Sequence, residues 1–191
     1  MGKGRLFVFS APSGAGKSTI LARLRDIFPH SVYSISHTTR PIREGETDGK
    51  DYFFVSREKF LEMVRRGEFL EWEEILGNYY GTSKEFITRA LEDGRWVFMD
   101  IDVKGAKNIK RCFPDAVLIF ILPPSMEELQ NRLSKRGTET KEVIQKRLEL
   151  GSKEILEAKS FDYAVVNKEL HEALREIEKI IREEAERDGH R

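Results

Sequence analysis

The stretch from Phe9 to Ile20, FSAPSGAGKSTI, constrains the fold more than any other part of the chain. It follows the phosphate-binding pattern G-x-x-x-x-G-K-[ST], except that Ala11 stands at the first glycine position. Such a loop binds phosphate through consecutive backbone N–H groups at a helix N-terminus, where the helix dipole adds positive potential. Ala11 is compatible with this role because the exit from a strand needs no positive φ. The sequence therefore predicts a strand at Leu6–Phe9, a phosphate-binding loop and a helix at Ile20–Phe28.

Individual residues of this loop have distinct expected roles. Gly14 and Gly16 allow backbone conformations and a close approach to phosphate that a Cβ would block. Each residue from 13 to 19 can supply a backbone N–H group, Lys17 can reach the outer phosphates of a nucleotide, and Ser18 can offer its hydroxyl to Mg²⁺. The alternative is a glycine-rich turn that precedes a lysine by chance. The flanking strand and helix patterns disfavour that alternative.

The composition indicates one globular domain. The 191 residues are 39% hydrophobic and 35% charged, which is typical of a globular, soluble chain and not of a disordered one. The formal net charge is zero, so we expect no bulk attraction to nucleic acid or to a membrane surface. Cys112 is the only cysteine, which excludes an internal disulfide and a cysteine-rich metal site. Without a membrane span or a signal-peptide core, a cytoplasmic location is expected.

Short apolar runs alternate with long amphipathic stretches, which favours an α/β fold with a parallel sheet. The predicted buried strands are Leu6–Phe9, Trp96–Met99, Val117–Leu122 and Tyr163–Val166. Apolar residues also recur along one face of a C-terminal helix, at Leu170, Ala173, Leu174, Ile177, Ile180 and Ile181. The fold class expected is therefore a P-loop NTPase-type parallel sheet flanked by helices.

Two segments depart from this core pattern. Between Tyr33 and Phe54 the sequence changes to short alternating runs, which indicates a small β-rich insertion. The segment from Met126 to Ala158 is heavily charged and helical in pattern, and it follows a capping box formed by Ser125 and Glu128. This second segment has the pattern of a mobile helical arm.

The insertion contains candidates for a second phosphate site. In SISHTTRPIREGETDGKDYFF, Arg40 and Arg43 lie three residues apart, and Tyr52 follows shortly after. Two guanidinium groups and a phenol could converge on a terminal phosphate. The residues alone leave open that these arginines are solvated loop residues.

A candidate for base recognition follows in EFLEWEEILGNYYGTS. Glu71 stands in an apolar setting, and Tyr80 and Thr82 come after the turn at Gly77. A single glutamate of this kind is more often a surface charge at a strand edge, so the residue by itself does not define a pocket.

The motifs together resemble one family. APSGAGKST, SHTTRPIREGETDGKDYFF, EFLEWEEILGNYYGTS, FMDIDVKGAK and KRGTET with the later IQKRL occur in the order found in guanylate kinases, through nearly the whole chain. The resemblance implies the reaction ATP + GMP ⇌ ADP + GDP with Mg²⁺. It also implies three parts: a core (residues 1–33, 84–125 and 159–191), a small mixed β GMP-binding subdomain (34–83) and a helical lid (126–158).

The resemblance also implies which residues form the sites. The residues expected to bind ATP are Ala11, Pro12, Ser13, Gly14, Ala15, Gly16, Lys17, Ser18, Thr19, Arg136 and Asn167, the last as a neighbour of adenine. The residues expected to hold the GMP phosphate are Arg40, Arg43, Tyr52 and Tyr80. Those expected to surround guanine are Ser36, Glu71, Thr82 and Asp102. The catalytic cations expected are Lys17, Arg40, Arg43, Arg136 and Arg147.

The chemistry of guanine agrees with these assignments. Its adjacent N1–H and N2–H donors suit an ionised carboxylate such as Glu71, and its O6 acceptor suits hydroxyl donors such as Ser36 and Thr82. Adenine reverses these hydrogen-bonding properties, so AMP would be disfavoured. Asp100 ends a predicted strand and is assigned to the Mg²⁺ shell through water, beside the hydroxyl of Ser18.

Direct in-line transfer needs no protein nucleophile, so these residues would supply position and positive charge. There are two alternatives, a non-catalytic binding module and another nucleotide kinase. Guanylate-kinase-like domains of scaffold proteins bind phosphorylated partners without catalysis, but such a module needs neither Lys17 nor the lid arginines. Another nucleotide kinase would use AMP, UMP or a sugar phosphate as acceptor, which Glu71 and its hydroxyl neighbours argue against.

ATP and GMP are the expected partners, and the chain is expected to be a monomer or a small homo-oligomer.

Overall fold

The structure is a computed structural model that describes residues 4–135 and 140–187. The strands are β1 (Arg5–Ser10), β2 (Val32–Ser34), β3 (His37–Thr38), β4 (Phe53–Phe54), β5 (Phe69–Ile75), β6 (Asn78–Ser83), β7 (Trp96–Asp100), β8 (Val117–Leu122) and β9 (Tyr163–Val166). The helices are α1 (Lys17–Ile27), α2 (Arg57–Arg65), α3 (Lys84–Glu92), α4 (Val103–Cys112), α5 (Met126–Lys135), α6 (Lys141–Leu156), the 3-10 helix η1 (Glu157–Ser160) and α7 (Leu170–Arg187). In these described ranges, no helix is both long enough and apolar enough to cross a membrane.

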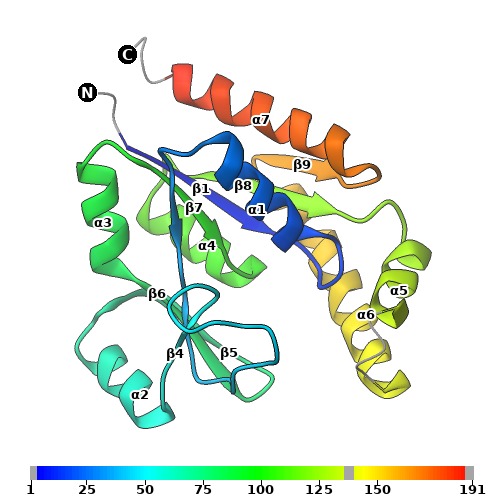
Figure 1. Cartoon of the computed structure of the whole chain (residues 1–191), viewed down its shortest axis with the longest axis horizontal. Coiled ribbons are helices and arrows are strands. Elements are labelled where there is room, and N and C mark those ends of the chain that lie inside the picture. Colours follow the sequence, from blue (N-terminus) through cyan, green and yellow to red (C-terminus); the bar gives the residue numbers. More distant parts are fainter. Residues whose placement is uncertain (1–3, 136–139, 188–191) are drawn as a thin grey trace.

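Five strands form a parallel sheet in the order β2-β7-β1-β8-β9 (Figure 1). The four predicted buried strands are all present in it, which confirms the predicted parallel core. The fifth, β2, is a three-residue strand that pairs with β7 at one edge. It was not predicted because three residues are too few to show a period. The phosphate-binding loop leaves the central strand β1 at the carboxyl edge of the sheet, where α/β proteins bind ligands.

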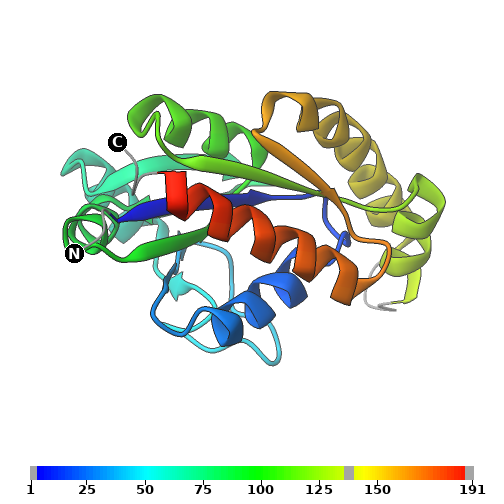
Figure 2. The same ribbon diagram turned by 90° about the horizontal axis from the view of Figure 1, so that it is seen from above.

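Helices cover both faces of this sheet. Phe7 and Phe9 of β1 pack on one face with α1 and α7, and Leu6 and Val8 pack on the other with α3 and α4. This alternation follows the two-residue period of a strand whose two faces are both buried. Seen from above, α1 and α7 lie on one side of the sheet and α4 on the opposite side (Figure 2).

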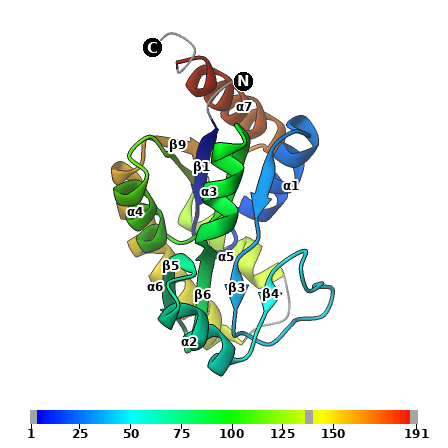
Figure 3. The same cartoon turned by 90° about the vertical axis from the view of Figure 1, so that its left-hand side faces the viewer.

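The insertion forms a separate sheet of four strands in the order β4-β3-β6-β5, with parallel and antiparallel pairs. It lies together with α2 at the far end of the molecule from α7 (Figure 3). The predicted β-rich insertion is thus present, but with other bounds than Tyr33–Phe54: Tyr33 and Ser34 belong to β2 of the core sheet, and the second sheet extends to Ser83 because β5 and β6 pair with β3. The fold class is confirmed. Helix α2 was not predicted; Ser56 caps it by accepting the N–H of Lys59 at 3.1 Å. Phe60 of α2 stacks on Phe69 and Tyr79 of the sheet.

The charged segment after β8 forms α5 and α6, which project beside the core (Figure 1). The predicted N-terminal cap is present, since the N–H of Glu128 donates to Ser125 Oγ at 3.0 Å. Leu129 and Leu133 of α5 are fully covered. Gly151 of α6 packs against Leu129 and Pro12, so the base of this helix pair rests on the phosphate-binding loop.

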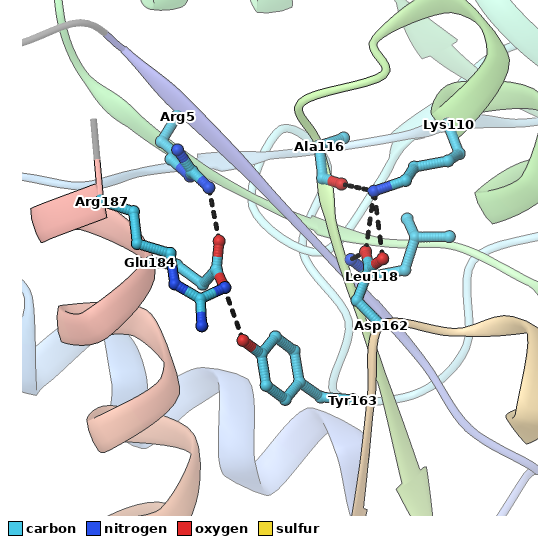
Figure 4. Close-up of polar contacts among 8 residues, drawn as sticks. All are labelled: Arg5, Lys110, Ala116, Leu118, Asp162, Tyr163, Glu184 and Arg187. Carbon is cyan, nitrogen blue, oxygen red and sulfur yellow. Dashed lines mark hydrogen bonds and ion pairs between the residues drawn. The ribbon is translucent and has the colours of Figure 1, made fainter. Parts of the chain in front are cut away.

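Helix α7 is held to the sheet by apolar packing and by one buried carboxylate. The predicted apolar face is confirmed, with Ile177 and Ile181 fully covered. On the same side, Glu184 accepts hydrogen bonds from Arg5 of β1, Tyr163 of β9 and Arg187 at 2.5–2.6 Å (Figure 4). The neighbouring Asp162 accepts from Lys110 and from the N–H of Leu118 (Figure 4).

Candidate active site

The phosphate-binding loop spans the gap between β1 and α1. The N–H of Ala15 donates to the carbonyl of Pro12 at 3.1 Å, and Gly16 precedes the helix with φ at 95°. Among the described residues, Leu76 is the one non-glycine residue with positive φ. Ala11 therefore has an ordinary backbone conformation, as predicted, and its departure from the motif does not disturb the loop.

Asn167, at the end of β9, supports this loop from beneath. Its Nδ2 donates to the carbonyl of Ala15 at 2.7 Å, and the residue is 6% exposed. A Cβ placed on Gly16 would lie 2.3 Å from the same Nδ2, so a side chain there would collide with Asn167 and would also be strained by the positive φ. Asn167 thus has a structural contact that the resemblance did not indicate; its role beside adenine stays a prediction.

Lys17 forms an ion pair with Asp100, the last residue of β7. Both side chains are partly covered, at 19% and 23% exposed. β7 lies next to β1 in the sheet, and the loop after β1 leads into α1, which begins at Lys17. The two residues therefore meet although they are 83 positions apart in the sequence. Asp100 therefore competes with any bound phosphate for the ammonium of Lys17.

The lid contributes arginines to the loop. Arg147 of α6 donates from Nη1 to Ser13 Oγ at 2.8 Å, so this predicted residue is at the phosphate-binding loop. Arg136, the other predicted lid arginine, lies outside the described residues. Arg132 of α5 was not predicted, and it donates to the carbonyls of Asn167 and Ala15 at 3.3 and 3.5 Å. Its position in the sequence, four residues before the predicted Arg136, was the available signal.

A single cavity of about 400 Å³ connects the loop with the insertion. The predicted site residues in its wall are Ala11, Pro12, Ser13, Gly14, Gly16, Lys17, Ser18, Thr19, Ser36, Arg43, Tyr52, Glu71, Tyr80, Asp100, Asp102 and Arg147. Four others are not in the wall but contact it directly or through one another: Thr82 donates to Glu71, Arg40 lies against the Tyr52 ring, Ala15 donates to Pro12, and Asn167 donates to Ala15. The core, the insertion and the lid therefore contribute to one space, which is large enough for nucleotide groups.

Glu71, which was predicted to recognise the base, lines this cavity and lies in a polar cluster. Thr82 Oγ1, fully buried, donates to Glu71 Oε1 at 2.7 Å. Asp102 caps α4 by accepting the N–H of Gly105 at 2.6 Å. A Cβ on Gly105 would lie 2.9 Å from Glu71 Oε2 and 3.2 Å from Asp102 Oδ1. The absence of a side chain at Gly105 thus makes room for the two carboxylates.

Burial raises the pKa of Glu71 to about 7, with the hydrogen bond from Thr82 opposing the rise and Asp102 adding to it. The pKa of Glu154 on α6 is also raised to about 7, by burial first, with Lys17 opposing. Glu154 lines the same cavity and was not predicted. It follows Arg147 and Leu150 on one face of the lid helix, at spacings of seven and four residues, and that stripe was its signal.

The phosphate end of the insertion contains Arg43, Tyr52 and Tyr80 in the cavity wall. The rings of Tyr52 and Tyr80 lie 6.0 Å apart, and burial raises the pKa of the Tyr52 hydroxyl above its usual value. Arg40 lies behind them, with its Cζ 5.4 Å from the centroid of the Tyr52 ring. The two predicted arginines are therefore near one another but differ in access to the cavity.

Comparison with known proteins identifies the family. The guanylate kinase family model matches residues 3–184. Guanylate kinases of Syntrophotalea carbinolica and Vibrio cholerae are 51% and 48% identical over 93% and 96% of this chain, and 85% and 90% of their own. The crystal structure of guanylate kinase from Anaplasma phagocytophilum superposes with a TM-score of 0.80 at 34% identity, covering 97% of this chain and 88% of that one. The chain belongs to the guanylate kinase family.

Proposed function

We propose that this guanylate kinase transfers the γ-phosphoryl group of ATP directly to GMP within the cavity shared by the core, the insertion and the lid. Phosphorylation of GMP to GDP is the activity of its family. The observation that carries the detailed proposal is the cavity itself. One wall contains the phosphate-binding loop with Lys17, and another contains Arg43 and Glu71.

On the donor side, the loop N–H groups and Lys17 bind the ATP phosphates. Ser13 to Thr19 surround the N-terminus of α1, where the helix dipole favours anions. Arg147 approaches from the lid and contacts Ser13, so it is close to the position of the outer phosphates. Arg136 and Asn167 complete the proposed ATP site, with Asn167 also supporting the loop.

On the acceptor side, the guanine base lies against Glu71, Thr82, Asp102 and Ser36. The ionised Glu71 accepts the N1–H and N2–H groups of guanine. In the structure the Thr82 hydroxyl donates to Glu71, so its one hydrogen becomes available to guanine O6 only after it rotates. Glu71 would then lose the hydrogen bond from Thr82, and the N–H donors of guanine would replace it. This exchange keeps both Glu71 and Thr82 paired.

The residues present are suited to Mg²⁺. Ser18 and Asp100 both line the cavity and offer a hydroxyl and carboxylate oxygens, the hard donors that this ion prefers. When bound with ATP, Mg²⁺ would supply charge neutralisation at the phosphates. Ser18 and Asp100 would hold it, Asp100 through water, with ATP oxygens filling other positions.

The phosphoryl transfer itself depends on position and charge. Arg40, Arg43, Tyr52 and Tyr80 hold the GMP phosphate so that one of its oxygens faces the γ-phosphorus in line. Lys17 and the arginines neutralise the charge that spreads over the transferring group. Because the lid and the insertion both contribute residues, full assembly requires both nucleotides, which limits transfer to water.

A coupled ADP-release assay with GMP, dGMP, AMP, UMP and CMP tests the proposal. We expect GMP to be phosphorylated with the highest kcat/KM and ATP hydrolysis without acceptor to be slow. Preference for another monophosphate would overturn the assignment of the base pocket. We also propose a cytoplasmic location, because the proposed reaction uses free nucleotides, and a monomer or small homo-oligomer as the active form.

A further inference from the structure

Arg40 has an internal partner that the sites described above do not use. Its Nη1 donates to Glu46 Oε2 at 3.0 Å and its Nη2 donates to Glu46 Oε1 at 2.7 Å. The two side chains are only 10% and 20% exposed. A paired fork of this kind fixes the plane of the guanidinium as well as its position.

The hydrogen bonds determine which edge of Arg40 remains available. A guanidinium has five N–H donors. Glu46 takes two of them, and the carbonyl of Pro41 takes the second donor of Nη1 at 2.7 Å. The donors not taken by Glu46 or Pro41 are the N–H of Nε and one N–H of Nη2, and the hydroxyl of Tyr80, a predicted phosphate ligand, also interacts with this guanidinium. These two N–H groups lie along a single edge of the guanidinium and can approach a phosphate together.

Aromatic rings limit the motion of this plane further. The Cζ atom of Arg40 lies 5.4 Å from the centroid of the Tyr52 ring and 5.7 Å from that of Phe54. Both distances are within the range of cation–π attraction. Tyr52 lines the cavity, so the rings connect the ion pair to the phosphate end of the site.

Glu46 also organises the second arginine of this site. Glu46 Oε2 accepts the backbone N–H of Arg43 at 2.8 Å, and the backbone N–H of Glu46 donates to the carbonyl of Arg43 at 3.1 Å. One carboxylate thus holds the side chain of Arg40 and the backbone of Arg43. The Arg40 guanidinium in turn lowers the pKa of Glu46, which burial only partly offsets, so the carboxylate stays ionised at neutral pH.

We propose that Glu46 is a positioning residue for the acceptor phosphate: it holds Arg40 so that the Nε–Nη2 edge faces the phosphate, and it holds the turn that carries Arg43. This inference rests on the proposed placement of the GMP phosphate beside these arginines. Positioning and simple electrostatics predict opposite effects of removing Glu46 on GMP binding. Glu46 is negative, so its removal raises the local positive charge, and simple electrostatics would then strengthen GMP binding. Loss of positioning weakens it.

The test compares Glu46→Gln with Glu44→Gln, which removes the same charge from an exposed position in the same loop. Both enzymes are assayed for kcat and for the KM of GMP and of ATP at constant ionic strength. We expect Glu46→Gln to raise the KM for GMP about ten- to a hundredfold, the range for loss of a hydrogen bond to a charged group, and to leave the KM for ATP within about twofold. Glu44→Gln should change neither by more than about twofold.

Two further variants connect the effect to Arg40. In an Arg40→Ala background, Glu46→Gln should have little additional effect on the KM for GMP, because Glu46 acts mainly through that side chain. Glu46→Asp keeps the charge but shortens the side chain, so it should raise the KM for GMP by less than Glu46→Gln does. Urea unfolding of each variant shows whether it is folded, and Glu46→Asp serves if Glu46→Gln is not.

Three results would overturn the inference. One is a KM for GMP that is unchanged or lower in Glu46→Gln; another is an equal rise in the KM of both nucleotides. The third is an unchanged KM for GMP in Arg40→Ala, which would show that the phosphate binds elsewhere. A wild-type enzyme that does not phosphorylate GMP would instead refute the proposed function.

Discussion

At the scale of single residues, the ionised form of the Glu71 carboxylate is disfavoured in the free protein. It is covered by the insertion and by α4, accepts one hydrogen bond from Thr82, and has the carboxylate of Asp102 nearby. Guanine would supply two donors to the same carboxylate. The residue is therefore better suited to the bound state than to the free one, as expected for a group that selects a ligand.

Glu71→Gln should change base selectivity more than overall rate. The amide places a donor where guanine needs an acceptor, and the lost hydrogen bond to a charged group costs about 1.5–3 kcal/mol, or about ten- to a hundredfold in kcat/KM for GMP. AMP should lose less or gain slightly. The KM for ATP should change little because its site is across the cavity. Kinetics with both monophosphates measure the ratio, and an equal decline for GMP and AMP would make Glu71 structural.

The raised pKa of Glu71 also predicts a pH dependence. Burial raises this pKa to about 7, and guanine needs the ionised form, so kcat/KM for GMP should rise as the pH increases through about 7 in the free enzyme. The GMP phosphate titrates near pH 6 and adds a second inflection. Profiles of Glu71→Gln should retain only the phosphate inflection. Glu154→Gln is the control, since the pKa of Glu154 is also about 7. An inflection near pH 7 that persists in Glu71→Gln and is lost in Glu154→Gln would contradict the assignment.

Lys17→Ala should abolish most phosphoryl transfer and leave the fold intact. The substitution removes the cation at the transferring phosphate and leaves Asp100 without this ion-pair partner. We expect a loss on the order of a thousandfold in kcat. Turnover and thermal melting are the measurements, and near-normal activity with an unchanged melting curve would remove Lys17 from the mechanism.

At the scale of secondary-structure elements, α7 shows how a distant helix keeps the active-site sheet in place. Its apolar face packs on the sheet, and Glu184 joins it to β1 and β9 (Figure 4). β1 leads directly into the phosphate-binding loop and β9 leads directly into Asn167, which supports that loop. The helix therefore braces the two strands that lead into the phosphate-binding loop and into Asn167.

Glu184→Ala should lower the free energy of unfolding by about 1.5–3 kcal/mol, because the change removes the charged acceptor of the hydrogen bonds from Arg5 and Tyr163. Glu183→Ala is the matched control: Glu183 is exposed on the same helix and its change should stay within about 0.5 kcal/mol. Urea unfolding measures both. Equal stability of the two variants would show that apolar packing alone holds α7.

At the scale of the whole molecule, two arms extend from the core on either side of the cavity. The insertion carries Leu76 at the tip of its β5–β6 hairpin, 81% exposed, and the lid carries Leu150, 45% exposed. Both residues line the cavity from opposite sides. Apolar side chains that face a shared space from two arms gain burial if the arms approach one another.

We therefore expect the arms to close when both nucleotides bind. Spin labels at Lys50→Cys and Lys141→Cys, in a Cys112→Ser background because Cys112 is exposed, would report the distance between the insertion and the lid. The distance should be shortest with GMP and a non-hydrolysable ATP analogue together, and intermediate with either alone. The same distance in every state would contradict two-arm closure.

Features with a local origin were determined by the sequence. The phosphate-binding loop, the four predicted core strands and the apolar face of α7 follow from motif spacing and from periods of 2 and 3.6 residues, which involve near neighbours only. The second nucleotide site had no such period. Its residues were identified by resemblance to a family, because single arginines and a single glutamate look like ordinary surface charges.

Other contacts were decided only by the tertiary structure. Asn167 supports Ala15 across 152 residues, and Arg147 reaches Ser13 across 134. Both contacts follow from the strand order, which places the ends of β1, β7, β8 and β9 at one edge of the sheet. The pairing of Arg40 with Glu46, although close in sequence, also required the folded turn. Contacts of these kinds depend on how elements and loops are placed in space, and hydrophobic periodicity carries no information about that placement.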